Sequence, residues 1–88
     1  MLVKLEEIIS DPAGHYSFRE IFLKGDKIIL LTDDVLTARK INVALDKNVD
    51  VCRVVVDVVG SEREIAVVGS ARTIKSKLNA QDRRQLNG

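Results

Sequence analysis

The chain has 88 residues and a formal net charge of +1, from 14 basic and 13 acidic side chains. This length is typical of one domain, and a hydrophobic share of 45% with a charged share of 31% is typical of a folded rather than a disordered chain. The balanced charge argues against a globally basic nucleic-acid binder and against a globally acidic protein. Because so short a chain buries only part of its apolar surface, self-association would add stability.

Residue types that build catalytic and metal sites are scarce in this sequence. It contains one His, one Cys and no Trp, whereas a metal ion needs three or four ligands and a general base needs a positioned partner. We therefore predict no enzymatic activity, no metal and no cofactor, and we interpret His15 as an exposed loop residue. Cys52 lies in the most apolar segment and is predicted to be a small buried hydrophobe, which favours a reducing, cytoplasmic location.

Membrane association is not expected from the sequence. The N-terminal residues lack the pattern of a signal peptide, and no apolar run approaches the roughly 18 residues of a membrane-spanning helix. The sequence contains neither an internal repeat nor a low-complexity segment.

The first third of the chain predicts strands joined by turns. Residues 2–8 alternate loosely and predict a strand, and residues 11–14 (Asp-Pro-Ala-Gly) have the composition of a type I turn. Residues 18–23 predict a second strand, and Gly25-Asp26 predicts a two-residue turn that pairs it in a hairpin with residues 28–31. Since residues 28–31 are apolar without alternation, we expect this strand to be covered on both faces.

A helix is predicted over residues 34–47. Thr32, Asp33 and Asp34 can cap its start, and Asn48 can end it. One helical face carries Val35, Ala38, Ile41 and Leu45. Leu36 and Val43 lie on a second side, which we expect either to be buried as well or to contact a partner, so they are the candidate protein-interface residues. The alternative to this helix is an irregular excursion between strands.

The second half predicts a hairpin and a last helix. Residues 49–59 form the strongest strand pattern, and residues 64–68 return as its partner after a turn at residues 60–62. Gly69-Ser70 then stops the strand and caps a helix, whose narrow apolar stripe consists of Ala71, Ile74 and Leu78. Strands grouped in hairpins predict an α+β fold: a small, largely antiparallel sheet of four to five strands built from two hairpins, with one central and one C-terminal helix. We assign residues 1–79 to this domain, and residues 80–88 to a basic tail or a helix extension.

The C-terminal segment is the most basic part of the chain. Residues 71–88 contain five basic residues against the single acid Asp82, a net charge of +4, which leaves −3 on residues 1–70. The candidate nucleic-acid contacts are Arg72, Lys75, Lys77, Arg83 and Arg84. No aromatic residue stands among them, so base stacking is not indicated, and a solvated helix face explains the same residues.

Two stretches are similar to known families in their hydrophobic pattern. Residues 18–33 (FREIFLKGDKIILLTD) followed by residues 53–78 loosely resemble small flagellar proteins of the FlbD/SwrD type, with residues 34–50 as an insertion and Lys24-Gly25 in place of the usual Asn-Pro. Residues 65–78 resemble the RemA/RemB matrix regulators, and that resemblance implies DNA binding and ring formation. The Arg-rich segment expected before the last hairpin is missing. Neither pattern contains a diagnostic motif, so no functional residue is carried over.

These observations predict a small, non-enzymatic interaction or assembly module in the cytoplasm. Its partner would be a second copy of itself or another protein, bound by a sheet edge or by Leu36 and Val43. Glu62, Arg63 and Glu64 would protect one edge of the sheet and leave the other edge free to pair. The alternative function is a small regulator that binds nucleic acid through the basic C-terminal helix.

Overall fold

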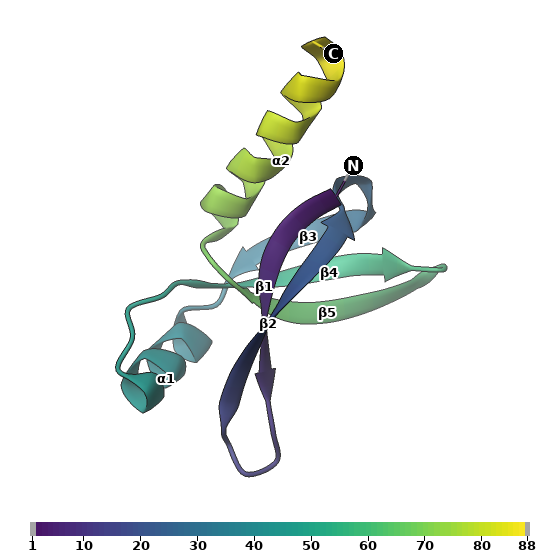
Figure 1. The fold of residues 1–88 in the computed structure, drawn as a ribbon. Coiled ribbons are helices and arrows are strands. Elements are labelled where there is room, and N and C mark those ends of the chain that lie inside the picture. The colour runs from purple at the N-terminus through teal and green to yellow at the C-terminus, as the bar shows by residue number, and fades with distance from the viewer. Residues whose placement is uncertain (1, 88) are drawn as a thin grey trace.

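The computed structural model of the protein describes residues 2–87, and the side chains of residues 2–80 (Figure 1). Five strands, two helices and one 3₁₀ turn follow each other as β1 (Leu2–Ser10), β2 (Tyr16–Lys24), η1 (Gly25–Lys27), β3 (Ile28–Asp33), α1 (Val35–Leu45), β4 (Val51–Val58), β5 (Ser61–Val68) and α2 (Ala71–Asn87). The strands form one antiparallel sheet in the order β2-β1-β5-β4-β3. The predicted α+β fold, with an antiparallel sheet, a central helix and a C-terminal helix, is confirmed, and so is the predicted hairpin of β4 and β5.

The sheet consists of two parts with a narrow joint. β1 pairs with β2 along the full length of both strands, and β3, β4 and β5 form an antiparallel meander. The two parts are linked by a single residue pair, Glu7 with Val67. In Figure 1, β1 and β2 run steeply across the direction of β4 and β5. The interior of the domain therefore lies between two crossing layers of strands.

The predicted hairpin at Gly25-Asp26 is wrong. β2 and β3 lie at opposite ends of the strand order and share no residue pairs, and η1 leads from one layer to the other instead of reversing the chain within a hairpin. β2 takes β1 as its partner because the turn after β1 lets the two strands pair over nine residues each. Gly14 N–H donates to the carbonyl of Asp11 at 3.0 Å in that turn, as expected for the Asp-Pro-Ala-Gly sequence.

The expectation that residues 28–31 are covered on both faces is also wrong, because two of the four side chains in this part of the edge strand β3 are exposed. A bulge shifts its register between Ile28 and Leu30. Ile28 and Leu31 both pack against the core, although they are three residues apart, while Ile29 and Leu30 are more than half exposed. A regular strand would send Ile28 and Leu31 to opposite faces. The bulge explains why Ile28 and Leu31 can both be core residues, and it leaves Ile29 and Leu30 as exposed apolar residues.

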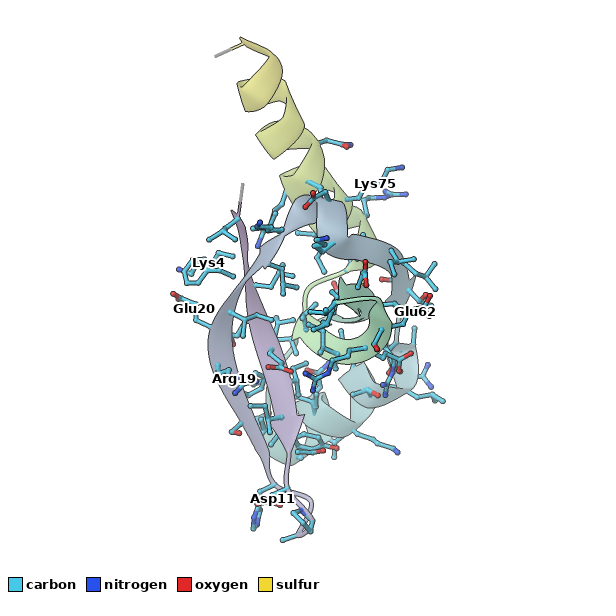
Figure 2. All side chains as sticks on the ribbon, turned by 90° about the vertical axis from the view of Figure 1, so that its right-hand side faces the viewer. Lys4, Asp11, Arg19, Glu20, Glu62 and Lys75 are labelled. Atoms are coloured by element: carbon cyan, nitrogen blue, oxygen red, sulfur yellow. The ribbon has the colours of Figure 1, made fainter. Side chains whose placement is uncertain are left out.

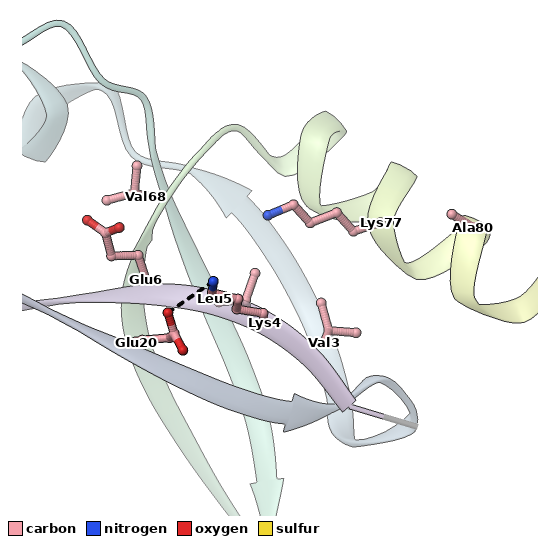
Figure 3. A pocket seen from close by; sticks show the side chains of 8 residues that line it. All are labelled: Val3, Lys4, Leu5, Glu6, Glu20, Val68, Lys77 and Ala80. Carbon is pink, nitrogen blue, oxygen red and sulfur yellow. Dashed lines mark ion pairs between the residues drawn. The ribbon is translucent and has the colours of Figure 1, made fainter.

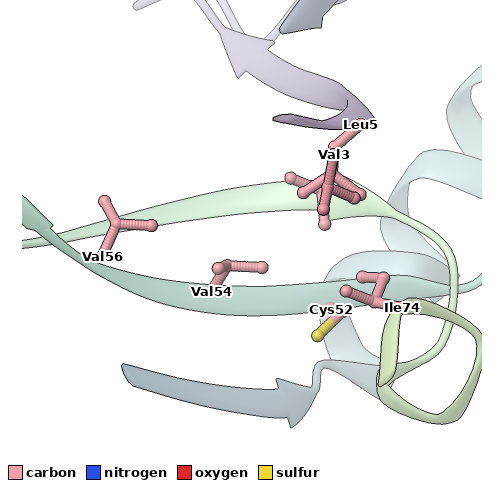
Figure 4. Close-up of a cluster of buried hydrophobic side chains, with 7 residues drawn as sticks. Val3, Leu5, Cys52, Val54, Val56 and Ile74 are labelled. Atoms are coloured by element: carbon pink, nitrogen blue, oxygen red, sulfur yellow. The ribbon is translucent and has the colours of Figure 1, made fainter. Parts of the chain in front are cut away.

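The two helices cover opposite faces of the sheet. Successive strand residues point to opposite faces, and Val51 and Cys52 are both fully buried on β4. Ile41 of α1 packs in the cluster that contains Val51, whereas Ile74 of α2 packs in the cluster that contains Cys52 (Figure 4). The apolar stripe predicted for α2 is thus confirmed by Ile74, which is 1% exposed. Burial raises the pKa of the Cys52 thiol.

One residue of the predicted apolar face of α1 does not pack inward. Ala38, Ile41 and Leu45 contact the second core cluster, but Val35 is 59% exposed. Val35 is the first residue of the helix and packs in neither core cluster. The helix ends at Asp46, which adopts a left-handed conformation with φ of 51°, two residues before the predicted stop at Asn48.

The turn between β4 and β5 has an unusual first residue. It is formed by Val59 and Gly60, with φ of 50° and 80°, between the paired residues Val58 and Ser61. Two positive φ values are typical of a type I′ turn, for which Asn-Gly is the preferred sequence, whereas a β-branched residue is strained in this conformation. Asp57 Oδ1 accepts a hydrogen bond from Gly60 N–H at 3.0 Å and supports the turn.

We expect a Val59→Asn variant to raise the free energy of unfolding by about 1 kcal/mol, because Asn tolerates the left-handed region better than Val. Val59 is 100% exposed, so the substitution removes no burial within one copy. Urea unfolding measured under conditions where the chain is monomeric checks this value. The matched control is Val43→Asn on α1, which should not be stabilising, and a Val59→Asn variant less stable than the original chain would contradict the strain argument.

Candidate interaction surfaces

Asp33 and Asp34 cap two different helices. Asp34 accepts hydrogen bonds from Thr37 N–H at 3.1 Å and from the Thr37 hydroxyl at 2.6 Å at the start of α1. Asp33 Oδ1 accepts a bond from Ala71 N–H at 2.8 Å, at the start of α2. Since successive residues leave the end of β3 toward opposite faces, one carboxylate serves the helix on each face. The two acids do not converge, which fits their interpretation as helix-start charges.

Arg53 ties the start of α1 to the sheet. Its Nε lies 2.7 Å from Asp34 Oδ2, and its Nη1 lies 2.8 Å from Glu64 Oε1 on the neighbouring strand. Hydrogen bonds from Thr37, and then the Arg53 guanidinium, lower the pKa of Asp34 from 3.8 to about 2. The three charged residues form a structural clamp on the α1 side of the sheet.

His15 lies in the exposed turn between β1 and β2. Its backbone N–H donates to Asp11 Oδ1 at 2.9 Å, and its Nδ1 lies 3.3 Å from Asp11 Oδ2. The ring is mostly exposed, as the sequence interpretation has it. Figure 2 shows Asp11 at the tip of this hairpin, at the end of the molecule opposite to Lys75.

The candidate interface residues of α1 point to solvent. Leu36 is 70% exposed and Val43 is 85% exposed, and neither packs in a core cluster. They are seven residues apart and therefore share one side of the helix. The sequence predicted that this side of the helix is either buried within the chain or in contact with a partner, and burial within the chain is not observed.

The basic residues of α2 are divided between two sides of the helix. Arg72 and Lys75 are exposed and, being three residues apart, are neighbours on one side. Lys77 points the other way, across a groove toward Glu6 and Val68 (Figure 3). Arg83 and Arg84 lie on the helical backbone of α2, beyond the residues whose side chains are described.

The groove beside Lys77 separates α2 from β1. It has a volume of about 520 Å³ and is bordered by residues 3–6 of β1 and by Lys77 and Ala80 of α2. Lys4 and Glu20 form an ion pair of 3.0 Å on its strand side (Figure 3). Side chains of both signs line this groove, so Lys77 is not part of a continuous cationic surface.

The turn η1 lies against α2. A Cβ atom built on Gly25 would be 3.0 Å from Leu78 Cδ2, so the backbone of the turn packs beneath the helix. Lys24 and Lys27, both exposed, flank this contact. Sequence reasoning missed them as neighbours of the basic helix, because some 50 positions separate η1 from Leu78 and no local pattern joins the two.

A second groove, of about 460 Å³, lies between β2 and the β4–β5 hairpin, and Glu7 of β1 also lines it. Residues 19–23 border it on one side, and Val56, Val58, Arg63 and Ile65 of the β4–β5 hairpin border it on the other. This groove is open because β5 pairs with β1 only at Val67.

Of the two arginines that line this second groove, one forms an ion pair and the other does not. Arg19 donates from both Nε and Nη2 to Glu7 Oε1, each at 2.8 Å. Arg63 is exposed and makes no ion pair with any side chain of residues 2–80. Sequence reasoning placed residues 62–64 at a protected sheet edge. β5 lies inside the strand order, but these three residues pair with β4 alone, because β1 pairs with β5 only at Val67, and Arg63 borders the groove.

Comparison of the chain with models of protein families, with curated proteins and with solved structures finds no match. The resemblances to flagellar proteins and to matrix regulators therefore gain no support. Within residues 2–80, no group of three His, Cys, Asp or Glu side chains is placed to hold a metal ion. Neither helix of the described chain combines the length and the hydropathy that a membrane crossing requires.

Proposed function

We propose that this chain is a small non-enzymatic interaction and assembly module that associates with further copies of itself. The observation that carries the proposal is the balance of its apolar residues. Ten large hydrophobic side chains are exposed in the described part of the chain, as many as form the buried core. Single exposed hydrophobic residues are ordinary. A domain that exposes as many large hydrophobic side chains as it buries, and whose core is small, favours coverage of the exposed ones by a partner.

The open strand edges support the same function. β2 and β3 are the two edge strands of the sheet, and β2 is nine residues long without Pro or a bulge. Both edges present large apolar side chains, namely Phe22, Ile29 and Leu30, each more than half exposed. Long apolar edges are places where further strands or chains add. A cytoplasmic location belongs to this proposal, because the free thiol of Cys52 suits a reducing compartment.

The mass of the chain in solution tests the proposal. We expect light scattering on a sizing column to give a defined oligomer at low and at high salt, because apolar contacts are not screened. Serial dilution should shift the mass toward the monomer. A monomer at both salt concentrations and at the highest accessible protein concentration would overturn self-association.

A second candidate function is nucleic-acid binding at the α2 end. It is favoured by the packing of η1 under α2, which places Lys24 and Lys27 on the same end as Arg72 and Lys75. Fluorescence anisotropy with a labelled DNA or RNA duplex over a salt series tests it. Binding that weakens with salt, and that loses about one unit of slope for each Lys→Ala change, would support phosphate contacts. The Arg83→Ala, Arg84→Ala double variant should then lose affinity with its assembly unchanged.

A further inference from the structure

The outer edge of β2 presents backbone groups that no strand of the chain pairs. β2 is the last strand in the order β2-β1-β5-β4-β3, and it pairs with β1 alone. Alternate residues of β2 therefore direct their N–H and C=O groups away from β1. Neither Pro nor a bulge interrupts the nine residues of the strand, so its edge can accept a further strand. In Figure 2, Arg19 and Glu20 of this strand lie along one margin of the molecule.

The second half of β2 carries side chains that lack a full set of partners on one face. Phe22 is 55% exposed and packs in neither core cluster. Two positions before it, Glu20 uses only Oε2 for its ion pair of 3.0 Å with Lys4. Two positions after it, Lys24 is exposed and makes no ion pair with the side chains of residues 2–80. An exposed aromatic ring is thus flanked by an acid and an unpaired cation on the same face of the sheet.

This face also has an excess of carboxylates. Glu20 stands directly opposite Glu6 of β1, and like charges in that position destabilise a sheet. Lys4 pairs with Glu20, whereas Glu6 makes no ion pair with any described side chain. A second cation beside Glu20, on the side away from β1, would offset this repulsion. The unpaired Lys24 of another copy can supply it there.

The pairing of β2 with a second β2 is restricted to a few registers. A two-fold axis at one residue of an antiparallel pair places opposite each other the residues that lie symmetrically about it, and their side chains then share a face. Within Tyr16–Lys24, only axes at residues 18 to 22 pair five or more residues of each copy. An axis at Arg19 or at Glu20 places two like charges directly opposite. An axis at Phe18 or at Ile21 places no opposite charges across the joint.

The axis at Phe22 is the remaining register, and it is complementary in charge and in polarity. Glu20 of each copy then lies opposite Lys24 of the other, so the excess carboxylate of one copy meets the unpaired cation of its mate. On the same face, the two Phe22 rings lie opposite each other at the axis. On the other face, Ile21 lies opposite Leu23. Each pair is of a kind that stabilises neighbouring antiparallel strands.

We propose that β2 pairs with β2 of a second copy, antiparallel about a two-fold axis at Phe22, so that the two sheets continue into one. Residues 20–24 of each copy form the joint, with a central pair of Phe22 rings and one Glu20–Lys24 ion pair on each side of it. This inference rests on the proposed self-association and names its interface. The contact is isologous and closed, so assembly through this edge ends at a dimer.

A Phe22→Asp variant should dissociate the dimer. We expect its dissociation constant to rise at least hundredfold, because two aromatic rings lose their burial and two carboxylates take their place at the axis. Phe22 packs in neither core cluster, so the monomer should keep its fold, which circular dichroism checks. Analytical ultracentrifugation over a concentration series measures the constant. The matched control is Leu36→Asp on α1, another exposed apolar residue, which should leave it unchanged.

A charge exchange tests the pairing of Glu20 with Lys24. Glu20→Lys and Lys24→Glu variants should each dimerise roughly tenfold more weakly, because both ion pairs of the joint become repulsive contacts. An equal mixture of the two variants should dimerise as the original chain does, because each Lys then lies opposite a Glu. Glu62→Lys and Lys40→Glu make the same changes of charge outside β2 and should have no effect.

Cysteine crosslinking tests the register. Residues at the axis are directly opposite their own copies, within the Cα separation that a disulfide spans, whereas all others are displaced along the strand. A Phe22→Cys variant should therefore form a covalent dimer under a mild oxidant, and a Glu20→Cys variant should not. The original chain is the control for Cys52, which is buried. Crosslinking through Glu20→Cys instead would place the axis at Glu20 and overturn the proposed register.

The outcomes separate this interface from self-association in general. An oligomer that survives Phe22→Asp but dissociates with Leu36→Asp would overturn the strand pairing and leave the proposed function standing. Failure of the mixed charge variants to recover would also overturn the Phe22-centred joint. An original chain that is monomeric at every concentration would overturn both the interface and the assembly function.

Discussion

An Ile74→Ala variant is expected to lose about 3 kcal/mol of unfolding free energy. Ile74 is 1% exposed and is the residue of α2 that enters the interior between the two crossing layers of strands. Its removal leaves a cavity next to Cys52 and the buried residues of β4, because the rigid strands cannot collapse into it. A chain of this size has a total stability on the order of 5–10 kcal/mol, so this single side chain accounts for a large part of it.

Urea unfolding followed by far-ultraviolet circular dichroism measures the effect. The control is Val43→Ala, which truncates a side chain that is 85% exposed and should change the stability by less than about 0.5 kcal/mol. A loss below about 1 kcal/mol for Ile74→Ala would show that α2 does not rest on the sheet as described. Leu78→Ala should cost less than Ile74→Ala, because Leu78 is only partly buried at the edge of the same cluster.

The local elements could be predicted because their signals lie within a few residues. Alternation along the middle of β4 separates the buried Val54 from the exposed Arg53, and this pattern suffices to recognise a strand. Ser70 was predicted to cap α2, and its hydroxyl does accept a hydrogen bond from Thr73 N–H at 3.1 Å. In each case the signal that predicts the element lies within a few neighbouring residues.

The pairing of β2 could not be predicted in the same way. Two turn signals flank it, Asp11–Gly14 on one side and Gly25-Asp26 on the other, and either one could form a hairpin. The choice depends on how well each neighbouring strand matches β2. β1 matches it over its full length, whereas β3 is six residues long and is bent by a bulge. A bulge follows from packing against residues far away, so an apolar run such as residues 28–31 gives no local sign of it.

The two grooves were out of reach of sequence reasoning for a related reason. Both exist because the β1–β2 hairpin joins the meander only through Glu7 and Val67, which lie 60 positions apart. The side chains of a groove then come from elements that have no common pattern. One local signal was nevertheless present, the Val-Val-Gly sequence at residues 58–60, where a hairpin turn with Asn or Asp before the Gly is usual. An unfavourable residue in a tight turn is thus a sign of local backbone strain that the sequence alone can give.

Acidification is expected to destabilise the protein through Asp34. Its pKa is about 2 in the folded chain and 3.8 for the unperturbed group. A carboxyl group whose pKa is lower in the folded state stabilises that state above the pKa of the unfolded chain, and this contribution is lost as the pH falls through the folded pKa. The hydrogen bonds from Thr37 contribute most to the lowered pKa of Asp34. Protonation of Asp34 therefore also weakens the N-terminal cap of α1. We expect a loss of about 1–2 kcal/mol between pH 4 and pH 2.

Two substitutions at this position separate the cap from the charge. Asp34→Ala should cost about 2 kcal/mol at pH 7, because it removes both the acceptor for Thr37 N–H and the ion partner of Arg53. Asp34→Asn should cost less than half as much, since Asn also caps helices well, but it removes the titrating group. Its stability should therefore fall less steeply than that of the original chain between pH 4 and pH 2.

Asp50→Asn is the matched control for these measurements. Asp50 is an exposed Asp directly before β4, next to Val51, whose carbonyl accepts a hydrogen bond from Asp34 N–H. Its carboxylate makes no hydrogen bond or ion pair with the described side chains. This variant should follow the pH dependence of the original chain. An Asp34→Asn variant that loses stability in acid as steeply as the original chain would contradict the depressed pKa. If Asp34→Ala were no worse than Asp34→Asn at pH 7, the cap would not contribute, and α1 would depend on the burial of Ile41 alone.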